Sequence, residues 1–231
     1  VQAPPLPQER QQKAQEEQTQ AAMPPIPHLS RKKERLEAAA PLFAGGVNYR
    51  ITDDDLGVAP PSQRYANNVA AIRLLKQLEA ENRAATPGEQ EVLAKYVGWG
   101  GLADCFDPRH SNYEGLKSLL SEEEYAAARE STLTAFYTPP VVIRGIYAAL
   151  GQMGFTQGNI LEPSCGIGNF LGMLPESMSG SKLYGVELDD LSGRIARQLY
   201  QKSSIAVQGY EKTAFPDNFF DVAIGNAPFG Q

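Results

Sequence analysis

The stretch NILEPSCGIGNF, residues 159 to 170, decides which fold we expect for this chain. It places an acid, a proline, a cysteine and two glycines directly behind a short apolar run that is typical of a strand. In a doubly wound sheet, the first loop from strand to helix needs glycines, because backbone must approach the ligand closely there. Gly166 and Gly168 occupy that place. The stretch therefore predicts the mouth of a cofactor pocket or, alternatively, only a tight turn.

Short apolar segments alternate with helical ones on both sides of this stretch. Helices are expected in FYTPPVVIRGIYAALGQM, with Thr138 as cap and Pro139 at the first helical position, and in DDLSGRIARQLYQK. The further strands are expected at 182–187, 204–208 and 220–226. Strands that alternate with helices at this spacing predict an α/β fold with a parallel sheet and right-handed crossovers.

Two segments of different texture precede the α/β region of residues 131–231. Residues 1–45 are rich in Gln, Glu, Pro and Ala, which is typical of a disordered segment or linker. Residues 46–130 are expected to form a small helical unit. Its helix-start signatures are Thr86 with Glu89 and Ser121 with Glu124.

The only tryptophan, Trp99, lies among glycines in GWGG, residues 98–101. A ring held in this way can be a stacking platform for a base. The alternative, which we favour, is a side chain that fills a corner between helices.

Composition narrows the classes of function. The net charge of −6 gives no global electrostatic reason to bind nucleic acid, so any contact with a polyanion must be local or come from a partner. Cys105 and Cys165 lie far apart without the histidines or cysteines of a zinc site, and we expect neither a metal nor a disulfide framework. No apolar run reaches about 18 residues and no secretory signal is recognisable, so a cytoplasmic protein without membrane contact is expected.

Glu187 ends the second predicted strand, about twenty residues beyond the first glycine, where a carboxylate can accept hydrogen bonds from both ribose hydroxyls. The dinucleotide-binding motif requires a third glycine at the position of Leu171, whereas the next glycine in this chain is Gly172, one residue further on. An NAD-type cofactor is therefore disfavoured, while another adenosine-bearing cofactor satisfies the same carboxylate. The bland alternative is a solvated acid at the end of a strand.

The segment FDVAIGNAPFG, residues 220–230, carries a second candidate site. The amide oxygen of Asn226 and the carbonyl of the nearby Pro228 can both accept hydrogen bonds from a planar amino group. Two such acceptors would draw the nitrogen lone pair out of conjugation and aim it at an electrophile, and Phe229 would stack on the ring that bears the amine. Asn-x-Pro is also a common turn after a strand, and that alternative stays open.

Four segments in this order, FYTPP, LEPSCGIGNF, YGVELD and IGNAPFG, resemble the class I S-adenosylmethionine-dependent amino-methyltransferases, in particular the adenine-N6 DNA methylases. With the segment from Arg64 to Asp107 in front, the chain resembles the methylase segment of large methylase-helicase proteins of conjugative elements and phages. The resemblance covers roughly residues 47–231. It implies a Rossmann-like methyltransferase sheet, S-adenosylmethionine as cofactor, and adenine in DNA as the target.

The resemblance also implies roles for single residues. The methionine end of the cofactor would lie against Tyr137, Thr138 and Pro139. The loop of Glu162, Gly166 and Gly168 would surround the methionine and the sulfonium, and Glu187 would hold the ribose. The target amine would be gripped by Asn226, Pro228 and Phe229, with the adenine turned out of the DNA stack.

The chain departs from the family's pattern in three ways. Tyr210 stands where an Asp that pairs with the cofactor's adenine is expected, and Glu211 is the nearest carboxylate. Ala227 replaces the first proline of the catalytic motif, although the acceptor there is a backbone carbonyl. Such a fold also needs three further strands and a module that reads the target sequence, yet the chain ends at Gln231.

These departures leave three hypotheses. The first is the N-terminal, cofactor-binding part of a DNA adenine-N6 methyltransferase that works with a C-terminal methylase or helicase portion. The second is an enzyme that methylates another amino group, such as a protein glutamine. The third is a truncated, non-catalytic relic that acts as a binding module.

Overall fold

A computed structural model describes residues 43, 45–55, 57–133 and 137–227 of the chain. All of them belong to one compact unit, residues 36–231. Most of the predicted disordered segment, as well as Pro228 and Phe229 of the predicted catalytic motif, lies outside the described residues.

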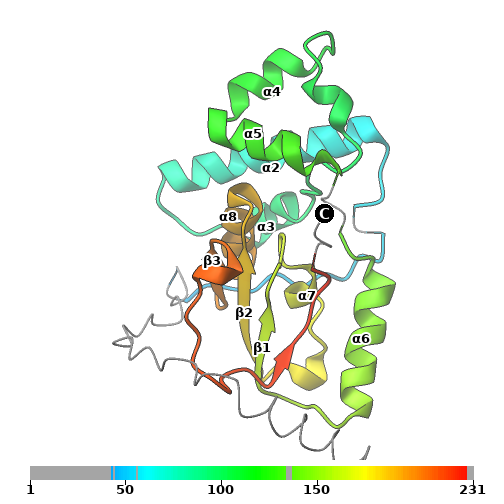
Figure 1. Cartoon of the computed structure of the whole chain (residues 1–231), viewed down its shortest axis with the longest axis vertical. Coiled ribbons are helices and arrows are strands. Elements are labelled where there is room, and N and C mark those ends of the chain that lie inside the picture. The colour runs from blue at the N-terminus through cyan, green and yellow to red at the C-terminus, as the bar shows by residue number, and fades with distance from the viewer. Residues whose placement is uncertain (1–42, 44, 56, 134–136, 228–231) are drawn as a thin grey trace, which may run out of the picture. The chain divides into compact units, whose positions relative to one another are not determined.

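The described part of the chain contains a four-stranded parallel sheet in the order β3-β2-β1-β4 (Figure 1). In the central pair Ile160 is aligned with Leu183, and on the outer side Ile160 is aligned with Val222. The arrangement confirms the predicted α/β, Rossmann-like fold. The strands are β1 (Asn159–Glu162), β2 (Lys182–Glu187), β3 (Ser204–Val207) and β4 (Val222–Ala223).

The described helices before residue 131 are called the helical segment below, and the later helices cover the sheet. The α-helices are α2 (Pro61–Ala80), α3 (Pro87–Leu93), α4 (Tyr113–Leu119), α5 (Glu122–Glu130), α6 (Pro140–Gln152), α7 (Asn169–Gly172) and α8 (Asp190–Leu199). Short 3-10 turns lie at η1 (Ala103–Phe106), η2 (Ser131–Leu133), η3 (Glu176–Met178) and η4 (Tyr210–Lys212). No helix in the described ranges combines the length and the apolar character needed to cross a membrane.

The two faces of the sheet are buried by different clusters, because successive side chains of a strand point to opposite faces. One face joins the main core, which includes Ile160 and Leu183 together with side chains of the helical segment. The opposite face carries Leu161 and Tyr184 under an aromatic cluster. That cluster consists of Phe215, Phe219 and Phe220 around Tyr184, with ring centroids 4.7–5.3 Å apart.

Local signals set most helix starts. Capping boxes form at Thr86 with Glu89 and at Ser121 with Glu124, as predicted. The prediction for α6 was wrong by one residue: the helix begins at Pro140, and Pro139 is the residue before it, without a side-chain cap. Either proline of the pair suits a first helical position, so the sequence alone did not distinguish them.

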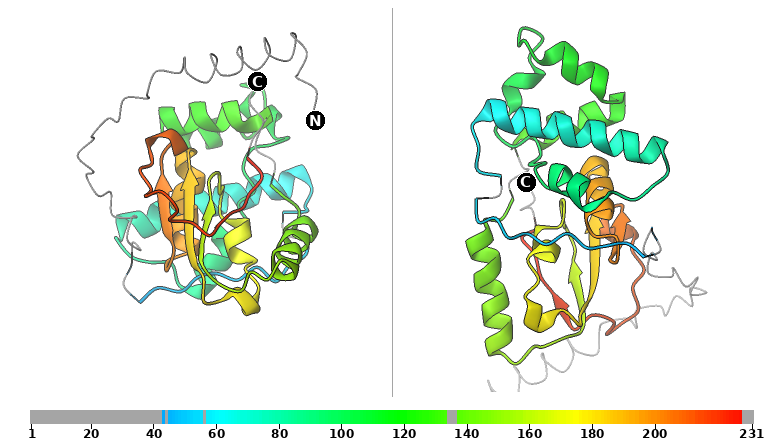
Figure 2. Two further views of the ribbon diagram at one scale, coloured as in Figure 1. Left: turned by 60° about the horizontal axis from the view of Figure 1, so that its bottom comes forward. Right: turned by 180° about the vertical axis from the view of Figure 1, so that it is seen from behind.

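The helical segment packs directly on α8, as the view from behind shows for α2 and α3 (Figure 2). The buried Gln90 amide of α3 donates to the carbonyls of Gln198 and Leu199, both at 3.0 Å. Arg194 of α8 bonds to Glu79 of α2 and to Glu124 of α5, the latter at 2.9 Å. The limits at 45 and 130 stay predictions, while the described residues on both sides of 130 share one core.

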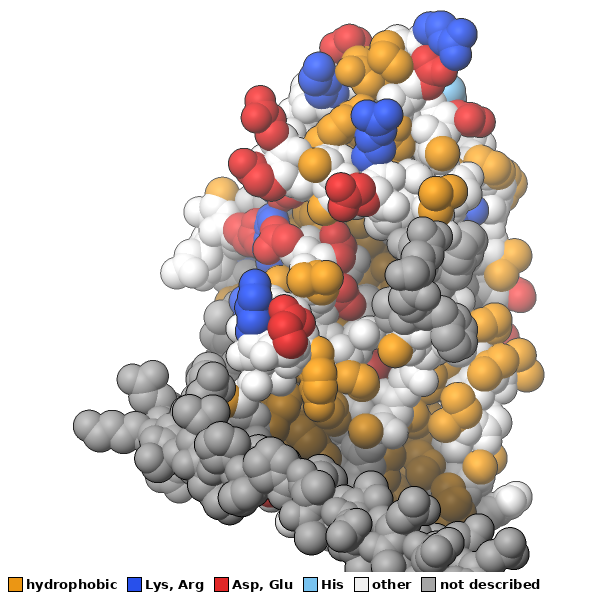
Figure 3. All heavy atoms as spheres, viewed as in Figure 1, with side chains coloured by type: hydrophobic (Ala, Val, Ile, Leu, Met, Phe, Trp, Pro, Cys, Tyr) orange, Lys and Arg blue, Asp and Glu red, His pale blue; other side chains and the backbone are white. Residues whose placement is uncertain are grey.

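Trp99 is 1% exposed and lies edge-on to Phe106, with ring centroids 5.4 Å apart. The ring centroids of Trp99 and Tyr65 are 6.4 Å apart, and these two rings are also edge-on to each other. The ring therefore fills a corner of the helical segment, in agreement with the favoured alternative, and offers no free face to a base. Over this segment, acidic and basic side chains lie side by side on the face shown in Figure 3.

Candidate functional site

The predicted cofactor residues meet at the edge of the sheet where the strands end. Glu187, the last residue of β2, accepts a hydrogen bond from the backbone N–H of Gly166 at 2.6 Å and one from Asp189 at 2.7 Å. The backbone N–H of Cys165 donates to the carbonyl of Val186 at 2.9 Å. The glycine loop after β1 is thereby bound to the end of β2, and Glu187 is held rather than solvated.

Glu162, the last residue of β1, is 3% exposed. Its Oε2 has no hydrogen-bond partner among the described residues. Burial raises the pKa of this carboxyl well above its ordinary value, and the charge of Glu187 adds to the effect. Burial also raises the pKa of Glu187, while the N–H donors of Asp189 and Gly166 act against that shift. An unpartnered, buried acceptor beside a glycine loop is what a polar ligand group at this edge would satisfy.

The glycines of the loop are required by close contacts. Gly166 has φ +54°, and a Cβ placed there would lie 2.7 Å from Cε1 of Tyr137. Gly168 has φ +87°, and a Cβ there would lie 2.3 Å from Cε2 of Tyr200. Residues that have a Cβ rarely adopt these φ values. The structure therefore brings Tyr137 onto the glycine loop, two elements that are distant in sequence.

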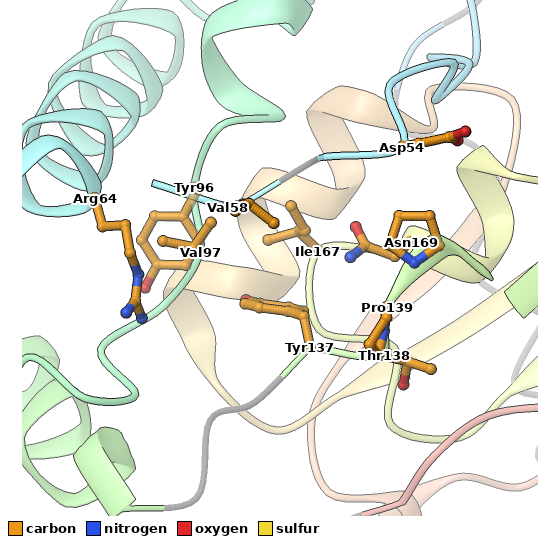
Figure 4. Close-up of a pocket in the computed structure, with 12 residues that line it drawn as sticks. Asp54, Val58, Arg64, Tyr96, Val97, Tyr137, Thr138, Pro139, Ile167 and Asn169 are labelled. Atoms are coloured by element: carbon orange, nitrogen blue, oxygen red, sulfur yellow. The ribbon is translucent and has the colours of Figure 1, made fainter. Parts of the chain in front are cut away.

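A cavity of about 250 Å³ opens beside the loop (Figure 4). One wall contains Thr138, Pro139 and Asn169, and Arg64 and Tyr96 of the helical segment lie on the other side. Its lining also includes Tyr137 and Ile167. The cavity thus takes in the three predicted residues of the 137–139 segment. Glu162, Glu187, Gly166 and Gly168 lie outside its lining.

Beyond Glu187, the edge of the sheet carries exposed apolar side chains. Leu188 is 74% exposed and Tyr210 is 51% exposed. The backbone N–H of Gln208 donates to the carbonyl of Glu187 at 2.8 Å, which brings the end of β3 next to the end of β2. Glu211 is exposed, and its carboxylate folds back against Gly209, so that a Cβ on that glycine would lie 2.2 Å from Oε1.

The predicted catalytic segment leaves β4 at the same edge. The backbone N–H of Ile224 donates to the carbonyl of Leu161 at 2.8 Å. A Cβ on Gly225 would lie 3.5 Å from Cγ of Glu162. Asn226, the next residue, is exposed. Its backbone therefore follows directly on a residue that contacts Glu162, while Pro228 and Phe229 lie outside the described residues.

Sequence reasoning missed three residues of this region. Leu188 follows Glu187 directly, and its exposure is a signal that only the structure gives. Asn169 stood in the quoted GIGNF stretch without a role. Arg64 carried no signal at all, because it lies in a helix that was interpreted from its apolar spacing alone.

The comparison with protein families agrees with this geometry. Residues 161–228 match the family described as methyltransferase domain. Over these residues the chain is similar to a methyltransferase domain. The match begins in β1 and ends at Pro228, so the 137–139 residues and Phe229 of the two candidate sites lie outside it.

Three curated relatives are similar to longer parts of the chain. Defense against restriction protein B of Escherichia phage P1 is 28% identical over 72% of the chain and 6% of its own length. The type II methyltransferase M.CvrRI of Paramecium bursaria Chlorella virus XZ-6E is 33% identical over 49% of the chain and 29% of its own length. The modification methylase CviBIII of Paramecium bursaria Chlorella virus NC1A is 27% identical over 47% of the chain and also 29% of its own length.

The matched parts of the chain therefore span only a minor part of each relative, between 6% and 29% of its length. No solved structure matches significantly.

Proposed function

We propose that this methyltransferase domain binds S-adenosylmethionine and is the cofactor-binding part of a DNA adenine-N6 methyltransferase. The observation that supports cofactor binding best is the position of Glu187. Its carboxylate ends the strand next to β1 and is fixed on the glycine loop by the 2.6 Å bond from Gly166. A carboxylate at this place in a doubly wound sheet is suited to the hydroxyls of a ribose.

The residues present fit such a cofactor. The unpartnered Oε2 of Glu162 offers an acceptor beside the loop. Leu188 and Tyr210 offer apolar surface next to Glu187, suited to a purine ring. When bound, S-adenosylmethionine supplies a methyl group on a positively charged sulfur. Glu211 is the carboxylate proposed to replace the expected Asp.

Asn226 is proposed to hold the amine that receives the methyl group. Its side-chain oxygen accepts one hydrogen bond from the amine, and a backbone carbonyl of the following residues accepts the second. Phe229 stacks on the ring, and Pro228 fixes the direction of the chain. These residues act by positioning, which can provide much of the reduction of a reaction barrier.

Adenine in DNA is the proposed target because the segment IGNAPFG resembles the catalytic motif of adenine-N6 methylases. The names of two relatives, a type II methyltransferase and a modification methylase, support the same class. The net charge of −6 indicates that affinity for DNA depends on further parts of the protein or on a partner. A methylase or helicase portion of a mobile genetic element is such a partner, and a cytoplasmic location fits it.

The experiment is methyl transfer from labelled S-adenosylmethionine to duplex DNA, with mass spectrometry of the nucleosides. The proposal predicts N6-methyladenine with the unchanged chain and none with Asn226→Ala. The exposed Asp217→Ala, nine residues earlier in the same region, is the matched control and keeps the activity. Label on protein instead of DNA contradicts the proposed substrate, whereas no label on either indicates that transfer to DNA requires the further parts of the protein.

A further inference from the structure

The cavity beside the glycine loop is lined by one positively charged side chain that has no role in the cofactor site described so far. Arg64 lies in the first turn of α2, is half-buried and lines the cavity. Its guanidinium donates to the carbonyl of Gly100 from Nη2, and its Nη1 lies 3.7 Å from the Cβ that Gly101 would have. An arginine has five N–H donors in a planar fork. Within the described part of the chain the guanidinium makes this one hydrogen bond, so further N–H donors stay available to a ligand.

Charges elsewhere in the lining are already balanced. The other charged residue of the lining is Asp54, and its carboxylate pairs with Arg144. Figure 4 shows the Asp54 carboxylate directed away from the other labelled side chains. Within the described part of the chain, Arg64 forms no ion pair with a carboxylate. The cavity therefore has a positive charge that is suited to an anionic ligand group.

The residues of the opposite wall indicate which anionic group the cavity is suited to bind. Thr138 and Pro139 belong to the segment proposed to lie at the amino-acid end of the cofactor, and Ile167 lies between the two loop glycines. A cavity of about 250 Å³ is smaller than the pockets of roughly 300–1,000 Å³ that hold whole drug-sized ligands. It suits one end of a cofactor whose remainder lies at Glu187.

We propose that Arg64 binds the carboxylate of the amino-acid end of S-adenosylmethionine, so that the helical segment supplies part of the cofactor site. The inference rests on the proposed function. A guanidinium fork matches a carboxylate through two parallel hydrogen bonds. A DNA phosphate is the competing ligand, but Arg64 is half-buried and shares the cavity with Thr138 and Pro139, which are proposed to hold the amino-acid end of the cofactor.

The test uses two ligands that differ only at the proposed contact. S-adenosylhomocysteine carries the amino-acid end, whereas 5′-methylthioadenosine lacks it and keeps the ribose and adenine. Isothermal titration of the whole chain with each ligand separates the two ends of the site. Arg64→Met is expected to weaken S-adenosylhomocysteine about 10- to 100-fold, as for a lost bond to a charged group. Binding of 5′-methylthioadenosine is expected to change less than about twofold, because that ligand never makes the contact.

Two controls make the outcome specific. Arg73→Met changes an exposed arginine of the same helix and is expected to leave both affinities unchanged. Glu187→Ala is expected to weaken both ligands, because both carry the ribose. Thermal denaturation checks that each variant is folded. If Arg64→Met does not fold, Arg64→Lys keeps the charge without the fork, and an intermediate loss for S-adenosylhomocysteine alone is expected.

Equal losses for both ligands with Arg64→Met overturn the inference, because they indicate a structural role of Arg64 on the Gly100 carbonyl. Unchanged binding of S-adenosylhomocysteine also overturns it, and weakened DNA binding in that case assigns Arg64 to a phosphate. If the unchanged chain binds neither ligand, the proposed function itself fails and the inference fails with it. A loss with Glu187→Ala but not with Arg64→Met leaves the proposed function standing and refutes only this inference.

Discussion

Replacing Gly168 by alanine tests the geometry of the loop after β1. The new Cβ would lie 2.3 Å from Cε2 of Tyr200, a side chain that is only 1% exposed. At φ +87° the left-handed backbone adds about 1–2 kcal/mol of strain for a residue with a Cβ. Forcing an extra group into a packed core costs about 1–3 kcal/mol. Gly168→Ala should therefore lower the free energy of unfolding by about 2–5 kcal/mol.

Gly145→Ala provides a matched control with the opposite sign. Gly145 lies on the exposed side of α6, and a Cβ there meets nothing within 4 Å. Alanine in a helix interior is favoured over glycine by about 0.5–1 kcal/mol, so this variant should gain stability. Urea denaturation of both variants measures the difference. A Gly168→Ala chain within about 0.5 kcal/mol of the unchanged one would refute the reasoning, since that value is below any overpacking cost.

Three further predictions follow from buried or paired charges. Because the pKa of Glu162 is raised in the folded chain, the contribution of this carboxyl to stability is complete at low pH and is lost as pH rises through the folded-state pKa. Glu162→Gln should therefore be more stable than the unchanged chain between pH 5 and pH 8, as measured by urea denaturation. Arg194→Met removes the ion pairs that join α8 to α2 and α5, and thermal or urea unfolding should show a loss of about 1–3 kcal/mol, unlike the exposed control Arg129→Met. Thr86→Ala removes a helix cap and should cost about 1 kcal/mol. The Arg83 guanidinium and the backbone N–H of Thr86 lower the pKa of Glu89 to about 2. The stability that the Glu89 carboxylate contributes is therefore present above about pH 5 and is lost as pH falls toward 2, as NMR titration of Glu89 would show.

The sequence predicted the elements whose signals are local. The apolar runs, the two capping boxes and the glycine loop depend on neighbouring residues, and they appear in the structure at the predicted places, except that β4 covers only Val222–Ala223 of the strand predicted over 220–226. The order of motifs also predicted the sheet, because strands that alternate with helices have few arrangements open to them. Where two prolines followed each other before α6, the same local signal fitted two registers, and the start was predicted one residue early.

The features that depend on distant contacts were not predictable. Burial of Glu162 without a partner depends on how β1, β2 and the segment after β4 pack together. The place of Arg64 depends on how α2 packs over the loop around Gly100, and nothing in its neighbours distinguishes it from an ordinary surface arginine. The glycine neighbours of Trp99 fitted both alternatives, and its 1% exposure in the structure decided for the corner between helices that we favoured.

The central claim is that Glu187 at the end of β2 holds an adenosine-bearing cofactor. Isothermal titration of the purified chain with S-adenosylmethionine, with Glu187→Ala and the exposed Glu176→Ala in parallel, tests it most directly. We expect micromolar binding to the unchanged chain and to the Glu176 variant, and a loss of binding with Glu187→Ala. A folded chain that binds no S-adenosylmethionine, or binding that survives Glu187→Ala unchanged, would contradict it.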